Sequence, residues 1–498
     1  MRIYLKTLQS ILAILLMLAP MQVLAAVPNQ DAQILHLLNR TSFGPTPSSI
    51  EAVRQMGFDA YIEQQLHPER FPVASDLQSR LLSLTTTNAS LADIVQQYQP
   101  MRDEGKLSEE ERQELGKRLN TVVFELSEAK ILRAIMSPAQ LQEVMTDFWF
   151  NHFNVFFGKG LDRVLISTYE RDAIRPHALG KFRDLLEATA RHPAMLFYLD
   201  NWQNIDPNSL QARKVLMKQG KELGINENYA REIMELHTLG VNGGYSQQDV
   251  TTLAHILTGW GIGRGQDWAG KAMFTFYPER HDFENKIFLG TTIQGGGTDR
   301  SEGGAGEVEN VLDLLAAHPS TAHHIAYELA QYFVADDPPQ SLVSKLTKTF
   351  ESTDGNIAAV LRTLFYSPEF WDPQYQQVKF KPPFRYVISA LRASDAVPPG
   401  DTRMVQGAIA GMGEPLYRCQ TPNGYANTND QWLNSDALLK RINIAKSLAH
   451  LLNEDTGSMI FNSLGSRNWS ADTIKTVQNN AAPLRPVLLL SSPEFLYY

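Results

Sequence analysis

The stretch from Asn226 to Gly240 combines amide, carboxylate, guanidinium and imidazole groups at helical spacing. Its Glu, Ala, Arg, Met and Leu residues favour a helix, and the glycine is a natural end for it. At about 100° per residue, Asn228, Glu232 and Glu235 fall on one polar stripe with Arg231 close by. The other flank is apolar and carries Tyr229, Ala230, Ile233, Met234, Leu236 and His237.

Two interpretations of this polar stripe are open. It is either the solvated face of a surface helix or the carboxylate-rich wall of a cleft. In a cleft, Glu232 and Glu235 would serve as general acid and base or as metal ligands, and Arg231 would hold an anionic group. Asn228 would then bind substrate.

His152 is the fourth catalytic candidate. It lies in Asp147-Phe148-Trp149-Phe150-Asn151-His152-Phe153, on the apolar stripe of a helix that Ser137-Pro138 is expected to start. A histidine in this position is either a core residue with one hydrogen bond or a ligand or acid-base group. Both interpretations stay open from the sequence.

Candidate ligands for a divalent metal are His237, His281 and Asp282, because imidazole and carboxylate groups suit such ions. Trp260 and Asp249 are added as substrate-binding candidates. Asp249 also fits a helix capping box that starts at a serine three residues earlier. No metal can be identified from these residue types alone.

Most common catalytic motifs are missing, among them Gly-x-Ser-x-Gly, the P-loop and His-Glu-x-x-His. Glu232-x-x-Glu235 matches the Glu-x-x-His pattern of dinuclear carboxylate sites only in part, because the histidine comes two residues later. The single cysteine, Cys419, excludes an intrachain disulfide and a zinc site built from cysteines.

The composition is that of a folding, acidic protein. Of 498 residues, 43% are hydrophobic and 20% charged, so the chain can bury a sizeable core. The formal net charge of −9 argues against a nucleic-acid partner, since such proteins are usually basic.

The first 25 residues have the pattern of a signal peptide. Arg2 and Lys6 precede an apolar run, Ile11–Leu18, that is too short to span a bilayer. Val23 and Ala25 supply the small residues of the −3 and −1 positions, which predicts cleavage after Ala25. We therefore expect an exported protein, periplasmic or extracellular, whose mature chain has no membrane span.

Helical patterns dominate the rest of the chain, so we predict a mainly α fold. One large domain, residues 30–498, is expected, with sub-regions 30–260 and 307–498 flanking a Gly-rich insertion of loops and short strands at about 261–306. Leu364–Phe370 and Leu490–Phe495 share a Ser-Pro-Glu-Phe pattern, which indicates either a duplicated unit or convergent helix capping.

Distinctive motifs run from about His36 to the C-terminus. They are His36–Thr46, Phe148–Phe153, Asn226–Gly240, Gly244–Val250, Leu257–Trp260, His281-Asp282 with Lys286, and Lys379–Pro383. Through them the chain resembles an exported bacterial family of unassigned activity, domain of unknown function 1800. It departs from that family at Arg418–Tyr425, where a more proline-rich run is typical, and at the charged stretch 100–118.

This resemblance implies a family rather than a reaction. Such proteins are often encoded beside a second exported family related to alkaline phosphatases and sulfatases, which suggests a partner. Two functions are therefore carried forward. One is a hydrolase-like enzyme with a cleft on the Asn226–Gly240 helix, with or without a divalent metal. The other is a non-catalytic helical scaffold that binds a partner protein or an envelope polymer.

Overall fold

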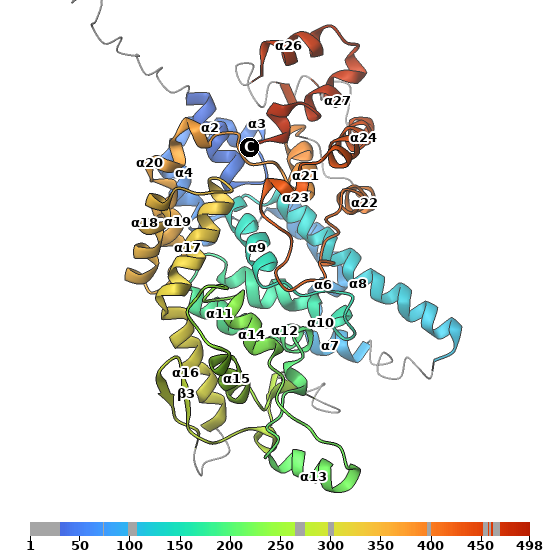
Figure 1. The fold of residues 1–498 in the computed structure, drawn as a ribbon. Coiled ribbons are helices and arrows are strands. Elements are labelled where there is room, and N and C mark those ends of the chain that lie inside the picture. Colours follow the sequence, from blue (N-terminus) through green and yellow to red (C-terminus); the bar gives the residue numbers. More distant parts are fainter. Residues whose placement is uncertain are drawn as a thin grey trace, which may run out of the picture.

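The computed structural model describes residues 30–72, 74–97, 107–263, 274–296, 303–395, 400–451, 457, 460–461 and 469–498. Across these ranges the chain is mainly α-helical, as predicted, and its strands form two small antiparallel sheets (Figure 1). None of the helices in these ranges is long and apolar enough to cross a membrane. The predicted signal peptide lies outside the described residues.

The N-terminal part consists of short helices followed by two long ones. They are α2 (Gln30–Thr41), α3 (Pro47–Met56), α4 (Phe58–Gln65), the 3-10 turn η1 (Pro68–Arg70), α5 (Ser75–Leu82), α6 (Thr85–Asn88), α7 (Leu91–Gln97), α8 (Glu109–Met136) and α9 (Gln140–His152). A capping box at Ser108 and Glu111 starts α8. Contrary to the prediction, Ser137 does not begin α9 but ends α8, and the Gln140 side chain donates to its carbonyl.

The middle of the chain carries most of the predicted site residues. Its elements are α10 (Asp162–Tyr169), the π-helical turn η3 (Glu170–Ile174), η4 (Arg175–His177), α11 (Phe182–Arg191), α12 (Pro193–Tyr198), η5 (Asn201–Gln203), α13 (Leu210–Gln219), α14 (Asn228–Glu235) and α15 (Gln247–Ile256).

In its described residues, 260–263, 274–296 and 303–306, the Gly-rich insertion forms two β-ribbons and one 3-10 turn. Its elements are β1 (Trp260–Ile262), β2 (Phe274–Phe276), η7 (Pro278–Arg280), β3 (Lys286–Phe288) and β4 (Thr291–Ile293). The first ribbon pairs Trp260 with Phe276, and the second pairs Lys286 with Ile293. The predicted short strands are therefore present.

Helices return after the insertion and continue to the C-terminus. They are α16 (Gly303–Ala317), α17 (Pro319–Phe333), α18 (Gln340–Ser352), α19 (Ile357–Phe365), α20 (Pro368–Trp371), η8 (Pro373–Tyr375), α21 (Pro383–Ala393), α22 (Arg403–Gly411), α23 (Asn429–Trp432), α24 (Ser435–Leu451), α26 (Ala471–Gln478), η10 (Ala482–Leu484), α27 (Arg485–Leu490) and α28 (Pro493–Leu496). The last residues return to the segment that precedes α21, where the backbones of Lys379 and Tyr498 bond to each other.

The two Ser-Pro segments have related local structures. Ser367 and Ser492 each precede a short helix, and each hydroxyl donates to the carbonyl three residues earlier. Only the Ser367 side chain also accepts a bond from a helix N–H. The two segments therefore share the serine hydroxyl bond to the preceding turn, but they differ in the cap of the following helix.

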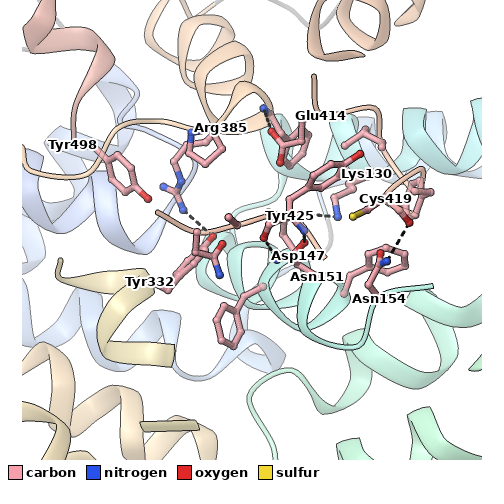
Figure 2. A pocket seen from close by; sticks show the side chains of 18 residues that line it. Lys130, Asp147, Asn151, Asn154, Tyr332, Arg385, Glu414, Cys419, Tyr425 and Tyr498 are labelled. Atoms are coloured by element: carbon pink, nitrogen blue, oxygen red, sulfur yellow. Dashed lines mark hydrogen bonds and ion pairs between the residues drawn. The ribbon is translucent and has the colours of Figure 1, made fainter. Parts of the chain in front are cut away.

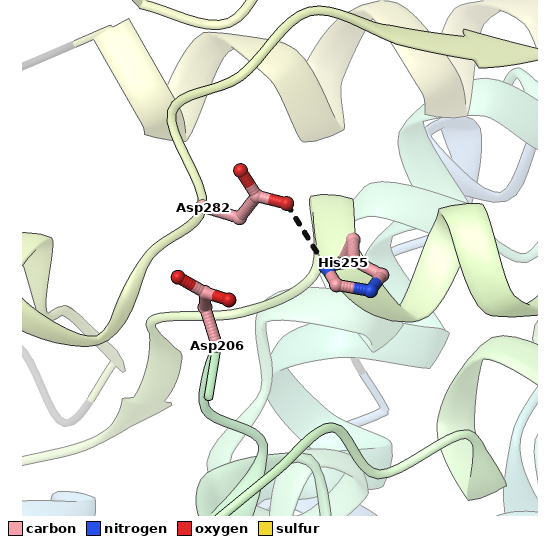
Figure 3. Close-up of side chains that lie close together, drawn as sticks. All are labelled: Asp206, His255 and Asp282. Atoms are coloured by element: carbon pink, nitrogen blue, oxygen red, sulfur yellow. Dashed lines mark ion pairs between the residues drawn. The ribbon is translucent and has the colours of Figure 1, made fainter. Parts of the chain in front are cut away.

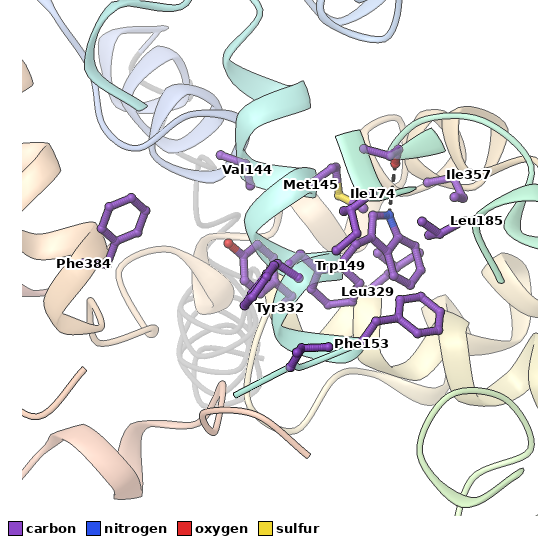
Figure 4. Packing of buried hydrophobic residues seen from close by; sticks show 14 of the residues in the cluster. Val144, Met145, Trp149, Phe153, Ile174, Leu185, Leu329, Tyr332, Ile357 and Phe384 are labelled. Atoms are coloured by element: carbon purple, nitrogen blue, oxygen red, sulfur yellow. Dashed lines mark hydrogen bonds between the residues drawn. The ribbon is translucent and has the colours of Figure 1, made fainter. Parts of the chain in front are cut away.

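A large apolar core extends from Ile34 to Leu496 and includes α9 (Figure 4). Trp149 of α9 is fully buried, and its indole N–H donates to the Ala178 carbonyl at 3.0 Å. Phe148, Phe153 and Phe182 pack around this ring or beside it. The aromatic residues of this α9 motif thus build part of the core.

The helix predicted for Asn226–Gly240 is shorter than expected. It covers Asn228–Glu235, because the Asn226 side chain accepts from the Asn228 amide in a turn before the helix. At the other end, the His237 amide donates to the Glu232 carbonyl, and the Thr238 hydroxyl donates to the Ile233 carbonyl. These bonds unwind the last turn before Gly240, whose φ is +81°.

A buried network of ion pairs joins α8, α9 and η3. The Lys130 ammonium lies 2.7 Å from Asp147 and 3.4 Å from Glu170. Glu170 also pairs with Arg175 at 2.8 Å and accepts the Tyr417 hydroxyl at 2.8 Å. Burial alone would raise the pKa of Glu170, but Lys130 and Arg175 lower it to about 2. The carboxylate is therefore ionised in the interior.

Two arginines of α21 attach the N-terminal segment to the core. Arg385 donates to the carbonyls of Asn39 and Ser42, and Arg392 donates to Gly44 and Ile135 at 2.7 Å each. Gly44 has a φ of +130°, and an added Cβ would lie 2.8 Å from that of Ser389, so only glycine fits this contact.

We predict that Arg392→Lys lowers the free energy of unfolding by about 2 kcal/mol or more, because one ammonium cannot replace the guanidinium fork at buried carbonyls. Chemical denaturation measures this loss. Arg403→Lys is the matched control, since that side chain is 76% exposed, and a change within about 0.5 kcal/mol is expected there. Equal stability of both variants would contradict the role assigned to Arg392.

Candidate functional site

Asp206, His255 and Asp282 form a compact cluster of possible metal ligands (Figure 3). One ligand atom from each residue lies within 4.8 Å of the others, and in the described ranges no other group of three such residues meets this limit. His255 Nδ1 lies 2.9 Å from Asp282 Oδ2. Ligands about 2.1 Å from one ion are roughly 3 Å apart at neighbouring positions, so this pair has a suitable spacing.

Asp206 is held by the loop that follows η5. Its amide donates to the Arg280 carbonyl at 2.9 Å, and its carboxylate accepts the Asn208 amide at 3.1 Å. Two residues earlier, the Asn204 side chain donates to the Ala254 carbonyl at 2.8 Å and accepts the Asn226 amide at 2.9 Å. These bonds fix the loop against both α15 and the start of α14.

His255 lies near the end of α15, on the same stripe as Gln247 and Thr251. Both of these residues donate to Glu227 at 2.8 Å, and Arg231 contacts the same carboxylate at 3.1 Å. The hydrogen bonds from Thr251 and Gln247 lower the pKa of Glu227. The network connects the beginning of α14 to the helix that carries the imidazole.

Asp282 follows η7 and is backed by buried charges. Its amide donates to the Thr258 hydroxyl, and the preceding His281 lies 2.6 Å from the Thr258 carbonyl and 3.2 Å from Glu307. Lys286 donates to the Asp282 carbonyl at 2.6 Å and pairs with Glu307 at 3.1 Å. Glu307 thereby pairs with Lys286, whose ammonium also lies 3.8 Å from Asp282 Oδ1.

The charges within the cluster favour a cation between the carboxylates. Burial raises the pKa of Asp206, and the nearby charge of Asp282 raises it further. Contact with Asp282 raises the pKa of His255. Burial would raise the pKa of Asp282, but His255, the Glu284 amide and Lys286 outweigh this effect and lower it. A divalent ion would stabilise both carboxylates in their charged form.

The predicted polar stripe of α14 does not form one cluster with the histidines. Arg231 binds Glu227 and Gln247. Glu232 is half-buried, and burial together with Glu235 raises its pKa. Glu235 lies 3.5 Å from the Tyr245 hydroxyl. The two carboxylates thus influence each other, as expected from their spacing, but have no histidine partner in the described contacts.

His152 and His237 lie in a separate buried group with His324. The ring centroids of His237 and His324 lie 6.1 and 6.2 Å, respectively, from the ring centroid of His152. His152 Nδ1 contacts Glu328 at 2.7 Å, and its other nitrogen lies 3.2 Å from the His237 carbonyl. Burial lowers the pKa of His237 well below its usual value, so its ring is neutral.

The remaining predicted residues have local partners. Asn228 is exposed and donates to the Leu199 carbonyl, and Asp249 completes the capping box of α15 and accepts the Leu289 amide. Trp260 is buried in β1 against Phe274. Of the three predicted metal ligands, Asp282 alone belongs to the cluster, whereas His281 contacts Glu307 behind it.

Sequence reasoning missed Asp206 and His255. Asp206 stands in an Asp-Pro-Asn-Ser turn, which resembles ordinary loop chemistry. His255 follows Gln247 and Thr251 at i+8 and i+4, so it continues a polar stripe one helix turn beyond the Glu227 contacts. This spacing indicated that His255 shares a helix face with Gln247 and Thr251, but it carried no information about Asp206 and Asp282, which are distant in sequence.

Comparison with known proteins identifies the family of this chain. The family model described as "Protein of unknown function (DUF1800)" matches residues 36–497. The chain belongs to this family. The matched range includes Asp206, His255 and Asp282 of the candidate metal cluster and every residue of α14. No curated protein and no solved structure matches the chain.

We predict that Glu328→Gln destabilises the protein by about 1–3 kcal/mol near neutral pH, because the buried His152 ring loses the carboxylate that it contacts at 2.7 Å. Burial would raise the pKa of Glu328, but His152 lowers it. A lowered carboxylate pKa stabilises the fold above the unfolded pKa, and this contribution is lost as pH falls through the folded value.

Thermal unfolding at several pH values measures the effect. The difference in Tm between the wild type and Glu328→Gln should become smaller as the solution becomes acidic. Glu351→Gln, on the exposed face of α18, is the control, and its Tm should equal that of the wild type at each pH. A gap that stays constant down to strongly acidic pH would refute the linkage.

Proposed function

We propose that the protein is a hydrolase-like enzyme that uses a divalent metal ion held by Asp206, His255 and Asp282. The observation that carries this proposal is the approach of three ligand atoms within 4.8 Å of one another. Two carboxylates and one imidazole suit Zn²⁺ or Mn²⁺, and they balance the charge of either ion.

Two of the three cluster residues are partly accessible to solvent. The His255 side chain is 30% exposed and that of Asp282 is 14% exposed. Three protein ligands with an open position are typical of catalytic sites, whereas structural zinc sites are closed by four. A bound ion would lower the pKa of a water molecule at that position and polarise the bond under attack.

Neighbouring side chains support the geometry of such a centre. Glu307 holds both His281 and Lys286 behind the Asp282 loop. Partners of this kind orient metal ligands and typically change affinity by about 10- to 100-fold when lost. Asn226 and Glu227 connect the family motif to the same centre through Asn204 and α15.

A second candidate is a non-catalytic scaffold, favoured by the interlocked Glu227, Arg231 and Gln247 side chains. In this alternative the α14 motif fixes helix geometry and the protein docks a partner, such as an exported phosphatase-like protein. Export itself also remains our proposal, based on the predicted signal peptide.

We predict that the purified protein binds about one equivalent of Zn²⁺ or Mn²⁺ by titration calorimetry and by elemental analysis after dialysis. Asp206→Asn, His255→Gln and Asp282→Asn should each weaken binding at least about tenfold, since each removes one of three ligands. Hydrolysis of nitrophenyl phosphate and acetate esters should fall in parallel in these variants, whereas wild-type protein stripped of metal by a chelator should regain activity when metal is added back.

His67→Gln is the matched control. His67 forms a histidine–carboxylate pair with Glu69 at 3.1 Å, but that pair is exposed and does not belong to any group of three possible ligands among the described residues. This variant should bind metal as the wild type does. Absence of binding in the wild type, or unchanged binding in all three cluster variants, would refute the metal proposal.

A further inference from the structure

The cavity between α9, α21 and the loop that follows α22 has a volume of about 60 Å³ and contains paired side chains (Figure 2). Lys130 lies 2.7 Å from Asp147, and Arg385 donates to the Tyr332 hydroxyl at 3.1 Å. Ligand pockets usually measure about 300 Å³ or more, so this cavity is too small for one. A stronger candidate for binding lies on the exposed surface, at α13.

Helix α13 carries large apolar side chains that face solvent, and it lies at the lower end of the molecule in Figure 1. Only Ala212 of its ten residues is buried. Leu210, Leu216 and Met217 are 52%, 47% and 78% exposed. Single exposed apolar residues are ordinary, but three on one short helix indicate a surface that binds another molecule.

Basic residues flank the apolar ridge that Leu210 and Met217 form on α13. At about 100° per residue, these two side chains lie about 20° apart, on the side of the helix away from Ala212. Arg213 lies about 40° from Met217 on one side of the ridge, and Lys214 lies about 40° from Leu210 on the other. Long basic side chains in this arrangement keep their charged ends in the polar layer while the ridge enters an apolar phase.

The segment 210–222 is basic within an acidic protein. Its four basic side chains are all exposed, and they are Arg213, Lys214, Lys218 and Lys221. Among the residues that the structure describes, no carboxylate forms an ion pair with any of these four. Four basic residues and one acidic residue give the segment a formal charge of +3, whereas the whole chain carries −9. The segment is therefore suited to an anionic partner.

The start of α13 is fixed to the loops of the candidate metal centre. The Ser209 hydroxyl accepts the Ala212 amide, and the Ser209 amide donates to the Asp206 carbonyl at 3.0 Å. From the other side, Arg280 of η7 donates to the Gln211 side chain at 2.8 Å. A partner that binds α13 would therefore lie close to the loops that carry the metal ligands.

The size of α13 favours a lipid surface over a folded protein as its partner. A helix of ten residues is about 15 Å long and about 10 Å wide. Its outer face is small beside the roughly 800 Å² that each partner buries in a stable protein complex. An anionic bilayer needs only a few inserted apolar side chains and basic residues beside its phosphate groups.

We propose that α13 binds the surface of an anionic lipid bilayer, with Leu210 and Met217 inserted among the head groups and the basic side chains of the segment 210–222 beside lipid phosphates. This binding is independent of metal. It would hold the loops of the candidate metal centre close to the bilayer.

The test is a vesicle flotation assay with the mature chain, residues 26–498, in the presence of EDTA, so that no divalent ion bridges protein and lipid. One set of vesicles contains about 30% phosphatidylglycerol in phosphatidylcholine, and the other is phosphatidylcholine alone. At about 0.1 M salt the protein should float at least about fivefold more with the anionic vesicles, and this excess should disappear at about 0.5 M salt.

The variant Lys214→Glu/Lys218→Glu should bind the anionic vesicles about tenfold more weakly, because attraction to the phosphates becomes repulsion. The matched control is Lys117→Glu/Lys348→Glu, which changes the net charge equally at exposed positions of α8 and α18. It should bind within about twofold of the wild type.

The apolar contribution is tested by Met217→Gln, which should weaken vesicle binding about threefold or more. Leu82→Gln is its control, because Leu82 of α5 is 64% exposed and lies outside α13. Equal binding to both vesicle types, equal losses in the two lysine variants, or unchanged binding by Met217→Gln would overturn the proposal. Absence of vesicle binding together with binding to a polyglutamate peptide would also overturn it and would assign α13 to an acidic protein.

Discussion

The structure depends first on pairing charges that are buried in its interior. Glu170 is the centre of the main network, where Lys130, Arg175 and Tyr417 meet from different parts of the chain. Removing one partner would leave an uncompensated charge, which costs far more than a solvated ion pair contributes. Correct placement of α8, α9 and the loop after α22 is thereby coupled to one carboxylate.

The same constraint shapes the candidate metal centre. Behind it, Glu307 balances His281 and Lys286, so the buried charges there are already satisfied. In front of it, Asp206 and Asp282 share a single imidazole. Asp282 is paired with His255 at 2.9 Å and lies 3.8 Å from Lys286, and Asp206 lies beside the same imidazole. A divalent cation would add positive charge between the two carboxylates.

Local patterns in the sequence were sufficient for the mainly helical fold and for the short strands of the insertion, because periodicity and capping residues act over a few positions, as at Ser246. The predicted start of α9 was wrong, since Ser137 ends α8 instead. The extent of α14 was wrong because its ends are set by the Asn226 and Thr238 side chains, which compete with the helix.

The site was less predictable because its residues are distant in sequence. Asp282 was predicted as a ligand, but Asp206 and His255 become its neighbours only through loop contacts made by Asn204 and Thr258. The most direct test of the metal centre is an anomalous-scattering crystal structure of protein soaked in Zn²⁺ or Mn²⁺. The account predicts a peak within coordination distance of Asp206, His255 and Asp282; its absence there in a well-ordered map would contradict it.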